Sequence, residues 1–265
     1  MPAKDGRLVA QENEVKVLRA LHRFGWLRTR DLAALVWRPW QTAPTNAPDL
    51  TPLMPSASHW RMAQRTLRRL VGDRLVLKAS GPDGSVIYTL AEAGAARLRY
   101  IGIPASSGKD LVRRSSANQF RHRCIANEVA IAGIAAGFRV STEREVAQGR
   151  WPGGDAGIAG KKPDVLLQGN GQVWWTEVER SRKNQKDYAN LLQWLTKIGR
   201  GTIHATEAVA PGKGLSWGGI VFICTPAFRA KLMRDLAAAG WSGSTLKRLV
   251  SFETELYKFE NMLFA

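Results

Sequence analysis

Cysteine and histidine are scarce in this sequence. The 265 residues include two cysteines, Cys124 and Cys224, which form neither a CxxC pair nor a disulfide framework. We therefore expect two buried free thiols in a reducing compartment. The four histidines lack metal-ligand spacing with one another or with a cysteine, which argues against a zinc site.

Long apolar runs are also absent. The longest apolar stretch, "IANEVAIAGIAAGF" (residues 125–138), contains Asn127 and Glu128 and is too short to cross a bilayer. The amino terminus has no basic segment followed by an apolar segment, the pattern of a secretion signal. These features predict a soluble, cytoplasmic protein with no membrane partner.

Acidic residues are few relative to basic ones. The chain has 22 Asp and Glu against 39 Lys and Arg, a net charge of +17. Residues 1–110 carry 17 basic and 9 acidic side chains, and residues 111–265 carry 22 and 13, so both halves are basic. The charge predicts a polyanionic partner, most commonly nucleic acid. The length accommodates two domains, expected at 1–110 and 111–265.

The first half has the pattern of a small helical domain. Residues 11–27, "QENEVKVLRALHRFGWL", place Val15, Leu18 and Leu21 at helical spacing before Gly25, which can end the helix. "TRDLAALVW" predicts a second helix with Thr29 as its N-cap. The following segment, residues 38–56, contains five of the 12 prolines and predicts a long loop.

A basic helix and a hairpin follow the loop. Residues 56–75, "SASHWRMAQRTLRRLVGDRL", combine an apolar stripe with an arginine-rich face. The turn "GPDG" (residues 81–84) between two β-like runs predicts a hairpin. Three helices and then a hairpin is the order of a winged helix-turn-helix, whose third helix reads DNA. Basic residues that merely solvate a small helical domain are the alternative. The expected DNA-binding residues here are Arg61, Gln64, Arg65, Arg68, Arg69 and Lys78.

The second half alternates between helical and strand-like segments. We expect a helix at 115–137 with Ser116 as N-cap, helices at 183–199 and 227–240, and strands at 138–146, 163–168, 172–179, 218–226 and 249–259. This order predicts an α/β (α+β) fold with a central mixed sheet flanked by helices.

Three carboxylates are concentrated in "PDVLLQGNGQVWWTEVERSRK" (residues 163–183). Glu177 and Glu179 lie two apart on one strand and share a face. If the preceding turn centres on Asn170, position 164 lies opposite 176, which brings Asp164 within diagonal reach of Glu177. Glu128, on the preceding helix, could point to the same place. Such oxygens suit Mg²⁺ or Mn²⁺, which can activate water and neutralise charge on a phosphodiester.

This order of elements, with Pro163-Asp164 opening one strand and Glu177-Val178-Glu179 on the next, resembles the PD-(D/E)xK nuclease superfamily over residues 116–226. The resemblance implies catalytic roles for Asp164, Glu177 and Glu179, and metal ligation by Asp164, Glu177 and Glu128. Glu179 stands where the pattern has lysine. Arg180, Arg182 and Lys183 are nearby cations, although strand alternation turns Arg180 to the opposite face, and Arg182 and Lys183 are further expected DNA contacts.

A second resemblance spans both halves. The winged-helix pattern, the helix containing "HRCIANEV" (residues 122–129), and residues 162–183 are similar to the replication-relaxation family of plasmids and integrative elements. The resemblance implies a bacterial, plasmid- or nucleoid-associated protein of DNA mobilisation, with double-stranded DNA and relaxosome proteins as partners. A homodimer would fit a palindromic site, although no residue pattern demonstrates one.

Two functions stay open at this point. The first is an endonuclease or nickase that depends on Mg²⁺ or Mn²⁺ and hydrolyses a DNA phosphodiester. The second is a non-catalytic DNA-binding accessory factor or transcription regulator with a degenerate nuclease fold. An RNA-binding protein is a third and weaker interpretation of the same charge.

Overall fold

The computed structural model describes residues 5–112, 116–179, 184–203, 211–212 and 214–257. The chain forms two compact units. The first contains the residues up to Trp40 together with Pro52–Ile131, and the second contains Gln41–Thr51 together with the chain from Ala132 onward. The division falls within a helix, later than the boundary expected after residue 110.

The first unit combines helices with a small antiparallel sheet. Its sheet has the strand order β1-β3-β2, with both pairs antiparallel. Its elements in chain order are α1 (Gly6–Phe24), β1 (Trp26–Arg28), α2 (Thr29–Val36), α3 (Ala57–Gly72), β2 (Val76–Ser80), β3 (Val86–Leu90), α4 (Glu92–Tyr100) and the short 3-10 helix η1 (Lys109–Leu111). Strand β1 was not expected, because three residues are too few to show an alternating pattern.

Caps define the helices of this unit. Helix α1 ends at Gly25, whose φ of 83° is easy for glycine, as expected. Helix α3 begins after Ser56, whose hydroxyl accepts a hydrogen bond from the His59 amide. The prediction that Thr29 caps α2 is wrong. Arg28 is the N-cap residue, and the Asp31 carboxylate accepts a hydrogen bond from its backbone amide at 2.9 Å.

No helix or strand interrupts the segment between α2 and α3, which confirms the expected long loop. Its middle part, Gln41–Thr51, belongs to the second unit. The Pro44 carbonyl accepts a hydrogen bond from the Asn170 carboxamide at 3.0 Å, and the Leu50 carbonyl accepts one from the Tyr257 hydroxyl at 3.0 Å. These bonds hold the loop against later parts of the chain.

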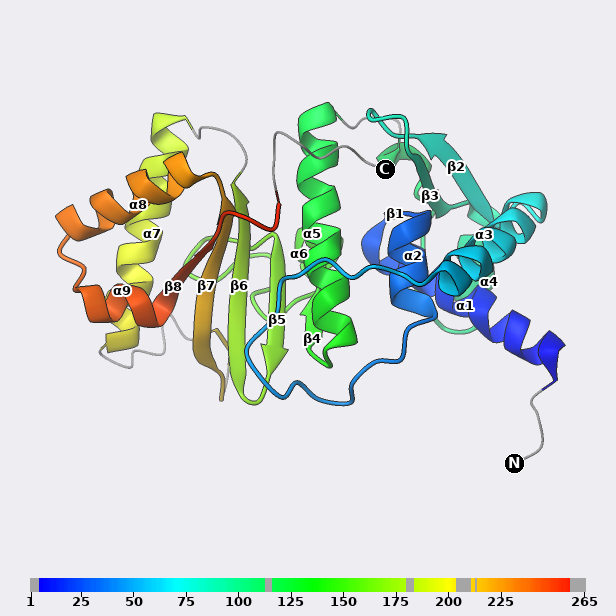
Figure 1. Cartoon of the computed structure of the whole chain (residues 1–265), viewed down its shortest axis with the longest axis horizontal. Coiled ribbons are helices and arrows are strands. Elements are labelled where there is room, and N and C mark those ends of the chain that lie inside the picture. Colours follow the sequence, from blue (N-terminus) through cyan, green and yellow to red (C-terminus); the bar gives the residue numbers. More distant parts are fainter. Residues whose placement is uncertain (1–4, 113–115, 180–183, 204–210, 213, 258–265) are drawn as a thin grey trace. The chain divides into compact units, whose positions relative to one another are not determined.

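The second unit is built on a five-stranded mixed sheet with the order β4-β5-β6-β7-β8 (Figure 1). Strands β4, β5 and β6 are antiparallel neighbours, whereas β6, β7 and β8 run parallel. The elements from the shared helix onward are α5 (Ala117–Ala135), β4 (Arg139–Ser141), α6 (Glu143–Ala147), β5 (Val165–Gly169), β6 (Gln172–Glu179), α7 (Gln185–Ile203), β7 (Ser216–Cys224), α8 (Pro226–Ala238), α9 (Gly243–Leu249) and β8 (Val250–Glu253). The expected mixed sheet with flanking helices is therefore confirmed.

One local prediction for this unit is corrected, and one helix was missed. The segment 138–146 is not one strand, since β4 stops at Ser141 and α6 follows. Thr142 and Glu145 form a capping box that starts α6, and this local pairing competes with continuation of the strand. Helix α9 was not expected, because the run "GSTLKRL" has too few apolar positions to show a helical period.

Helices α7 and α8 lie on one face of the sheet (Figure 1) and bury a common core with it. Trp175 from β6, Phe222 from β7, Leu195 from α7 and Leu236 from α8 belong to this core. Cys124 and Cys224 are both buried free thiols, as expected. Within the described part of the chain, no helix combines the length and apolar character needed to cross a bilayer.

Candidate functional site: two carboxylates and a lysine

The turn between β5 and β6 determines which carboxylates meet. Asn170 and Gly171 have φ values of 50° and 73°, the left-handed pair of a two-residue hairpin turn. Val165 pairs with Thr176, so continuation of the ladder places Asp164 opposite Glu177. The expected register, with 164 opposite 176, is wrong by one residue because the turn contains two residues and is not centred on Asn170.

Asp164 is fixed at the start of β5 by backbone hydrogen bonds. Its amide donates to the Thr176 carbonyl at 3.1 Å. Its Oδ2 accepts a hydrogen bond from the Val178 amide at 2.7 Å. The carboxylate is therefore anchored to β6 next to Glu177, and a charge-assisted bond of this kind restricts its orientation.

Glu177 is a buried carboxylate, with 4% of the residue exposed. Its Oε1 accepts a hydrogen bond from Trp175 Nε1 at 2.6 Å and lies 2.5 Å from Lys161 Nζ. Burial raises the pKa of Glu177, Lys161 acts to lower it, and the nearby charge of Asp164 raises it further. Asp164 has this effect because the ladder places it opposite Glu177.

Lys161 is the residue of this site that the sequence analysis missed. Its Nζ lies over the rings of Trp175 and Trp194, 5.6 and 5.5 Å from their centroids, and 22% of its side chain is exposed. The run "GKKPD" places a lysine three residues before Asp164. That proximity in sequence was the available signal, but the contact with Glu177 requires the tertiary fold.

A tight turn positions Lys161. Ile158 and Lys161 form an isolated antiparallel bridge with backbone hydrogen bonds of 2.9 and 3.2 Å. Ala159, between them, has a φ of 52°, which is costly for a residue with a side chain. The Ile158 carbonyl also accepts a hydrogen bond from Trp194 Nε1 at 2.8 Å. The lysine thus extends from a turn that is attached to α7.

Gly157 allows this turn to pack closely. Its φ is 73°, and a Cβ added there would lie 2.4 Å from the Lys161 carbonyl oxygen. Backbone cannot yield as a flexible side chain does, so only glycine fits. Gly157 therefore has a structural role in presenting Lys161.

Glu179 shares the face of Glu177 but has different neighbours. It is buried, with 6% exposed, and pairs with Cys224 of the parallel strand β7. Burial, together with the charge of Glu179, raises the pKa of the Cys224 thiol to about 12. The described contacts therefore place Glu179 beside Cys224, while Lys161 provides the cation next to Glu177.

Glu128 lies in the first unit, where its carboxylate is bound by arginine. Arg28 Nη2 lies 2.6 Å from Glu128 Oε1 and 2.9 Å from Asp31 Oδ1. Burial raises the pKa of Glu128, and Arg28 opposes this rise. No group of three His, Cys, Asp or Glu side chains able to hold a metal is found among the described residues. Metal ligation by Glu128 stays a prediction.

The arginine face of α3 is exposed. Arg61, Arg65 and Arg68 are solvent-exposed at helical spacing, opposite the buried Ala63, Leu67 and Leu70. No acidic side chain in the described segments forms an ion pair with any of these three arginines. Gln64 is also exposed, and its backbone carbonyl accepts a 3.4 Å hydrogen bond from Arg68 Nε.

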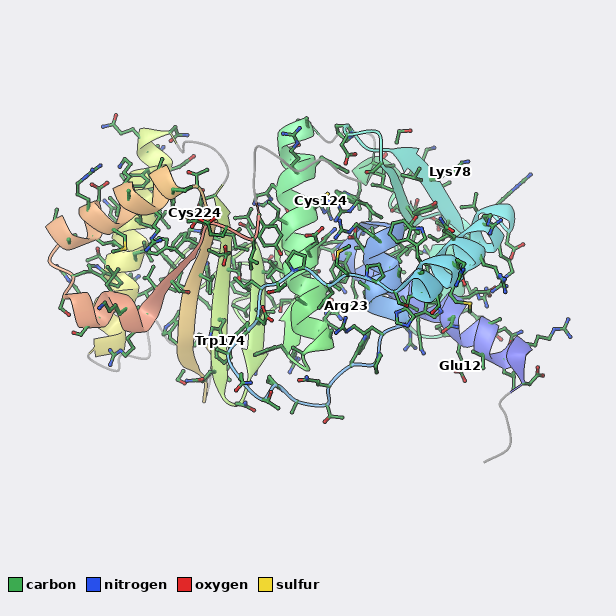
Figure 2. The ribbon with its side chains drawn as sticks, in the orientation of Figure 1. Glu12, Arg23, Lys78, Cys124, Trp174 and Cys224 are labelled. Atoms are coloured by element: carbon green, nitrogen blue, oxygen red, sulfur yellow. The ribbon has the colours of Figure 1, made fainter. Side chains whose placement is uncertain are left out.

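The remaining expected DNA contacts differ in availability. Arg69 Nε lies 2.5 Å from Glu14 Oε1, and Arg97 Nη1 lies 3.1 Å from Oε2 of the same carboxylate, so Arg69 is engaged in a shared ion pair within the unit. Lys78 is exposed on β2 (Figure 2). Arg182 and Lys183 lie outside the described residues.

No protein-family model, curated protein or solved structure matches this chain.

Proposed function

We propose that the protein is a divalent-metal-dependent DNA endonuclease or nickase whose first unit holds duplex DNA. The observation that carries the proposal is the meeting of Asp164, Glu177 and Lys161 at the start of β5. Two carboxylates and an ammonium group at one position are a suitable set for phosphodiester hydrolysis. The net charge of +17 supports a polyanionic substrate.

The topology of the first unit supports a winged helix-turn-helix. The chain order α1-β1-α2-α3-β2-β3 places α3 directly before a hairpin, and the sheet order is β1-β3-β2. We propose that α3 enters the major groove and that the β2–β3 hairpin is the wing, with Lys78 as a backbone contact. Exposed arginines at 61, 65 and 68 suit phosphate and guanine contacts.

The topology of the second unit supports a PD-(D/E)xK nuclease fold. An antiparallel β4-β5-β6 arrangement is followed by α7 and by β7 parallel to β6, with the acids at the start of β5 and on β6. We further propose membership of the replication-relaxation family, which implies action on plasmid or integrative-element DNA in the bacterial cytoplasm, together with relaxosome proteins.

The two carboxylates fit a hydrated Mg²⁺ or Mn²⁺. Glu177 Oε1 is occupied by Trp175 and Lys161, whereas no described residue donates a hydrogen bond to Oε2. Mg²⁺ keeps several waters and takes one or two protein carboxylates plus substrate phosphate, so Asp164 and Glu177 are a sufficient pair of ligands. When bound, the ion supplies an activated water and neutralises charge that develops on the phosphate.

The protein side chains contribute position and charge. The Val178 amide orients the Asp164 carboxylate, and Trp175 Nε1 orients that of Glu177. Lys161 supplies the cation that position 179 lacks, and its ammonium can donate a hydrogen bond to a phosphate oxygen held beside Glu177. The surrounding tryptophans shield this charge from water and so strengthen its electrostatic effect.

Nicking of a supercoiled plasmid in Mg²⁺ or Mn²⁺ tests the proposal. We expect the wild type to convert supercoiled plasmid to the nicked form, and Asp164→Asn and Glu177→Gln to abolish this while retaining duplex binding. Asp155→Asn is the matched control, since Asp155 is an exposed carboxylate of the loop that precedes the site. Inactivity of the wild type in several divalent metals would contradict the proposal.

A second candidate function is a non-catalytic DNA-binding accessory factor or transcription regulator. The observation that favours it is the ion pair between Lys161 and Glu177, which already matches the charge of the more buried carboxylate. In that case the sheet would serve binding alone. Duplex binding by α3 with no nicking in any metal would support this function.

A further inference from the structure

A cavity of about 480 Å³ lies in the second unit beside Lys161. The turn at 159–161 lines one side, and α7 lines the other through Asn190, Gln193, Trp194 and Lys197. Lys161 lines the cavity and also contacts Glu177. The cavity and the acidic site therefore have a residue in common.

The sequence of α7 explains why polar groups line the cavity. Leu191, Leu195 and Ile198 pack into the core with the sheet. Asn190, Gln193 and Lys197 recur at intervals of three and four residues, so they form a polar stripe beside that apolar face. All three side chains are exposed.

The polar groups of the stripe are available to a ligand. Within the described part of the chain, no residue hydrogen-bonds to the carboxamides of Asn190 or Gln193, and none forms an ion pair with Lys197. A carboxamide presents two donors and one acceptor oxygen in a plane, which matches the hydrogen-bonding edge of a nucleobase. Lys197 adds an unmatched positive charge.

The charge of the cavity favours a ligand with a single negative charge. Asp187 also lines the cavity and accepts a hydrogen bond from the Asn184 carboxamide at 2.8 Å. Among the lining residues, Lys161 and Lys197 together with Asp187 carry a net charge of +1, so a polyanion such as a free triphosphate is disfavoured. One nucleotide within a strand carries one negative charge and a polar base edge. The cavity volume of about 480 Å³ lies in the range of small-molecule binding sites and is much larger than a single phosphate group requires.

We propose that this cavity receives one unpaired nucleotide of the DNA strand that the acidic site engages. Asn190 and Gln193 contact the edge of the base, and Lys197 with Lys161 contacts its phosphate. The inference rests on the proposed nuclease function, because the shared Lys161 places the nucleotide next to Asp164 and Glu177. A base inside a duplex must leave its stack to enter such a cavity, so single-stranded DNA is the preferred ligand.

Binding of a labelled single-stranded 12-mer and of the same sequence as duplex, measured by fluorescence anisotropy without divalent metal, tests the proposal. We expect Asn190→Ala/Gln193→Ala to weaken single-strand binding about tenfold through two lost hydrogen bonds. We expect Lys197→Ala to lower the salt dependence, log K against log salt, by about 0.7. Lys197→Arg should retain the affinity.

Matched controls lie on the same helix. Gln185→Ala and Lys186→Ala remove an exposed carboxamide and an exposed ammonium group that do not line the cavity, and both should bind within about twofold of wild type, as surface substitutions usually do. Unchanged single-strand affinity in the cavity variants, an equal loss on duplex, or complete competition by inorganic phosphate would overturn the proposal.

The two proposals fail in distinguishable ways. If wild type nicks plasmid while the cavity variants bind single strands normally, the nucleotide cavity is refuted and the nuclease stands. If the cavity variants lose single-strand binding but wild type and Asp164→Asn are equally inactive on plasmid, the cavity binds nucleic acid and the nuclease is refuted.

Discussion

Replacement of Lys161 by methionine tests the electrostatics of the site. The substitution retains much of the apolar stem against Trp175 and Trp194 but removes the only described ion-pair partner of Glu177. Glu177, at 4% exposed, must then carry an unmatched charge or take up a proton. Protonation limits the cost, since a neutral carboxyl needs no partner charge.

The upper limit of this free-energy cost follows from the ordinary pKa of glutamate. Starting from a value of 4.5, protonation costs at most about 3.4 kcal/mol at pH 7 and about 0.7 kcal/mol at pH 5. Burial already raises the pKa of Glu177 in the wild type, and Lys161 is partly exposed, so part of this cost is present before the substitution. We therefore expect Lys161→Met to destabilise by about 1–2 kcal/mol at pH 7 and by less than about 1 kcal/mol at pH 5.

The sign of the pH effect follows from the direction of the shift. A carboxyl whose folded pKa is raised contributes stability that is present below its unfolded pKa and is lost as pH rises through the folded pKa. Removal of Lys161 moves the folded pKa higher and enlarges that loss near neutrality. Urea denaturation followed by circular dichroism at pH 5 and pH 7 measures the difference.

Two controls separate this effect from a general loss of packing. Lys162→Met removes the adjacent, more exposed lysine and should change stability by less than about 0.5 kcal/mol. Glu177→Gln in the Lys161→Met background removes the charge, so the pH-dependent part should disappear. An equal loss at both pH values, or persistence of the pH dependence in the double variant, would refute the reasoning.

Three further predictions address the DNA interface, the loop before the site and the buried ion pairs. Each of Arg61→Ala, Arg65→Ala and Arg68→Ala should weaken duplex binding and lower the slope of log K against log salt by about 0.9. Arg7→Ala, at an exposed arginine of α1, should change neither quantity, and a salt titration of duplex binding measures both. Gly157→Ala should lower the free energy of unfolding by more than about 1 kcal/mol in urea denaturation and reduce nicking, because the added Cβ would meet the Lys161 carbonyl. Wild-type stability and nicking in this variant would show that the turn does not position Lys161. Arg28→Met should cost about 3–5 kcal/mol, because Asp31 loses its arginine and Glu128 keeps only the more distant Arg30, at 3.8 Å. Glu128→Gln should cost less, and a reversed order in urea denaturation would contradict this.

The sequence predicted the larger elements because their signals are local. The apolar periodicity of α7, the glycine at the end of α1 and the turn between β2 and β3 each lie within one short segment. The same holds for the mixed sheet, whose strands are apolar runs bounded by turn residues. Errors occurred where short-range hydrogen bonds decide the outcome, as in the Thr142–Glu145 capping box and the N-cap at Arg28.

The sequence could predict that Asp164 and Glu177 lie on neighbouring strands, but it could not predict which residues contact them. A strand pair joined by "GNG" places Asp164 and Glu177 at similar heights along the two strands, but only the observed register, with 164 opposite 177, turns both side chains to the same face. Lys161 could not be assigned, since its contact depends on the positive-φ turn at Ala159 and Gly160 and on the ring of Trp194 from a helix more than thirty residues later. The binding partner of Glu128, Arg28, is also distant in sequence and invisible to any local pattern.

Binding of Mn²⁺ to the purified protein, followed by electron paramagnetic resonance, tests the metal site most directly. We expect wild type to bind Mn²⁺, and we expect Asp164→Asn and Glu177→Gln each to weaken binding at least about tenfold, the lower end of the loss typical even for residues that only orient a ligand. Asp155→Asn should leave binding unchanged. Binding should tighten as pH rises, because the raised pKa of Glu177 makes a proton compete with the metal. No Mn²⁺ binding by wild type, or equal binding by Asp164→Asn and Glu177→Gln, would contradict the assignment of a metal-dependent nuclease site.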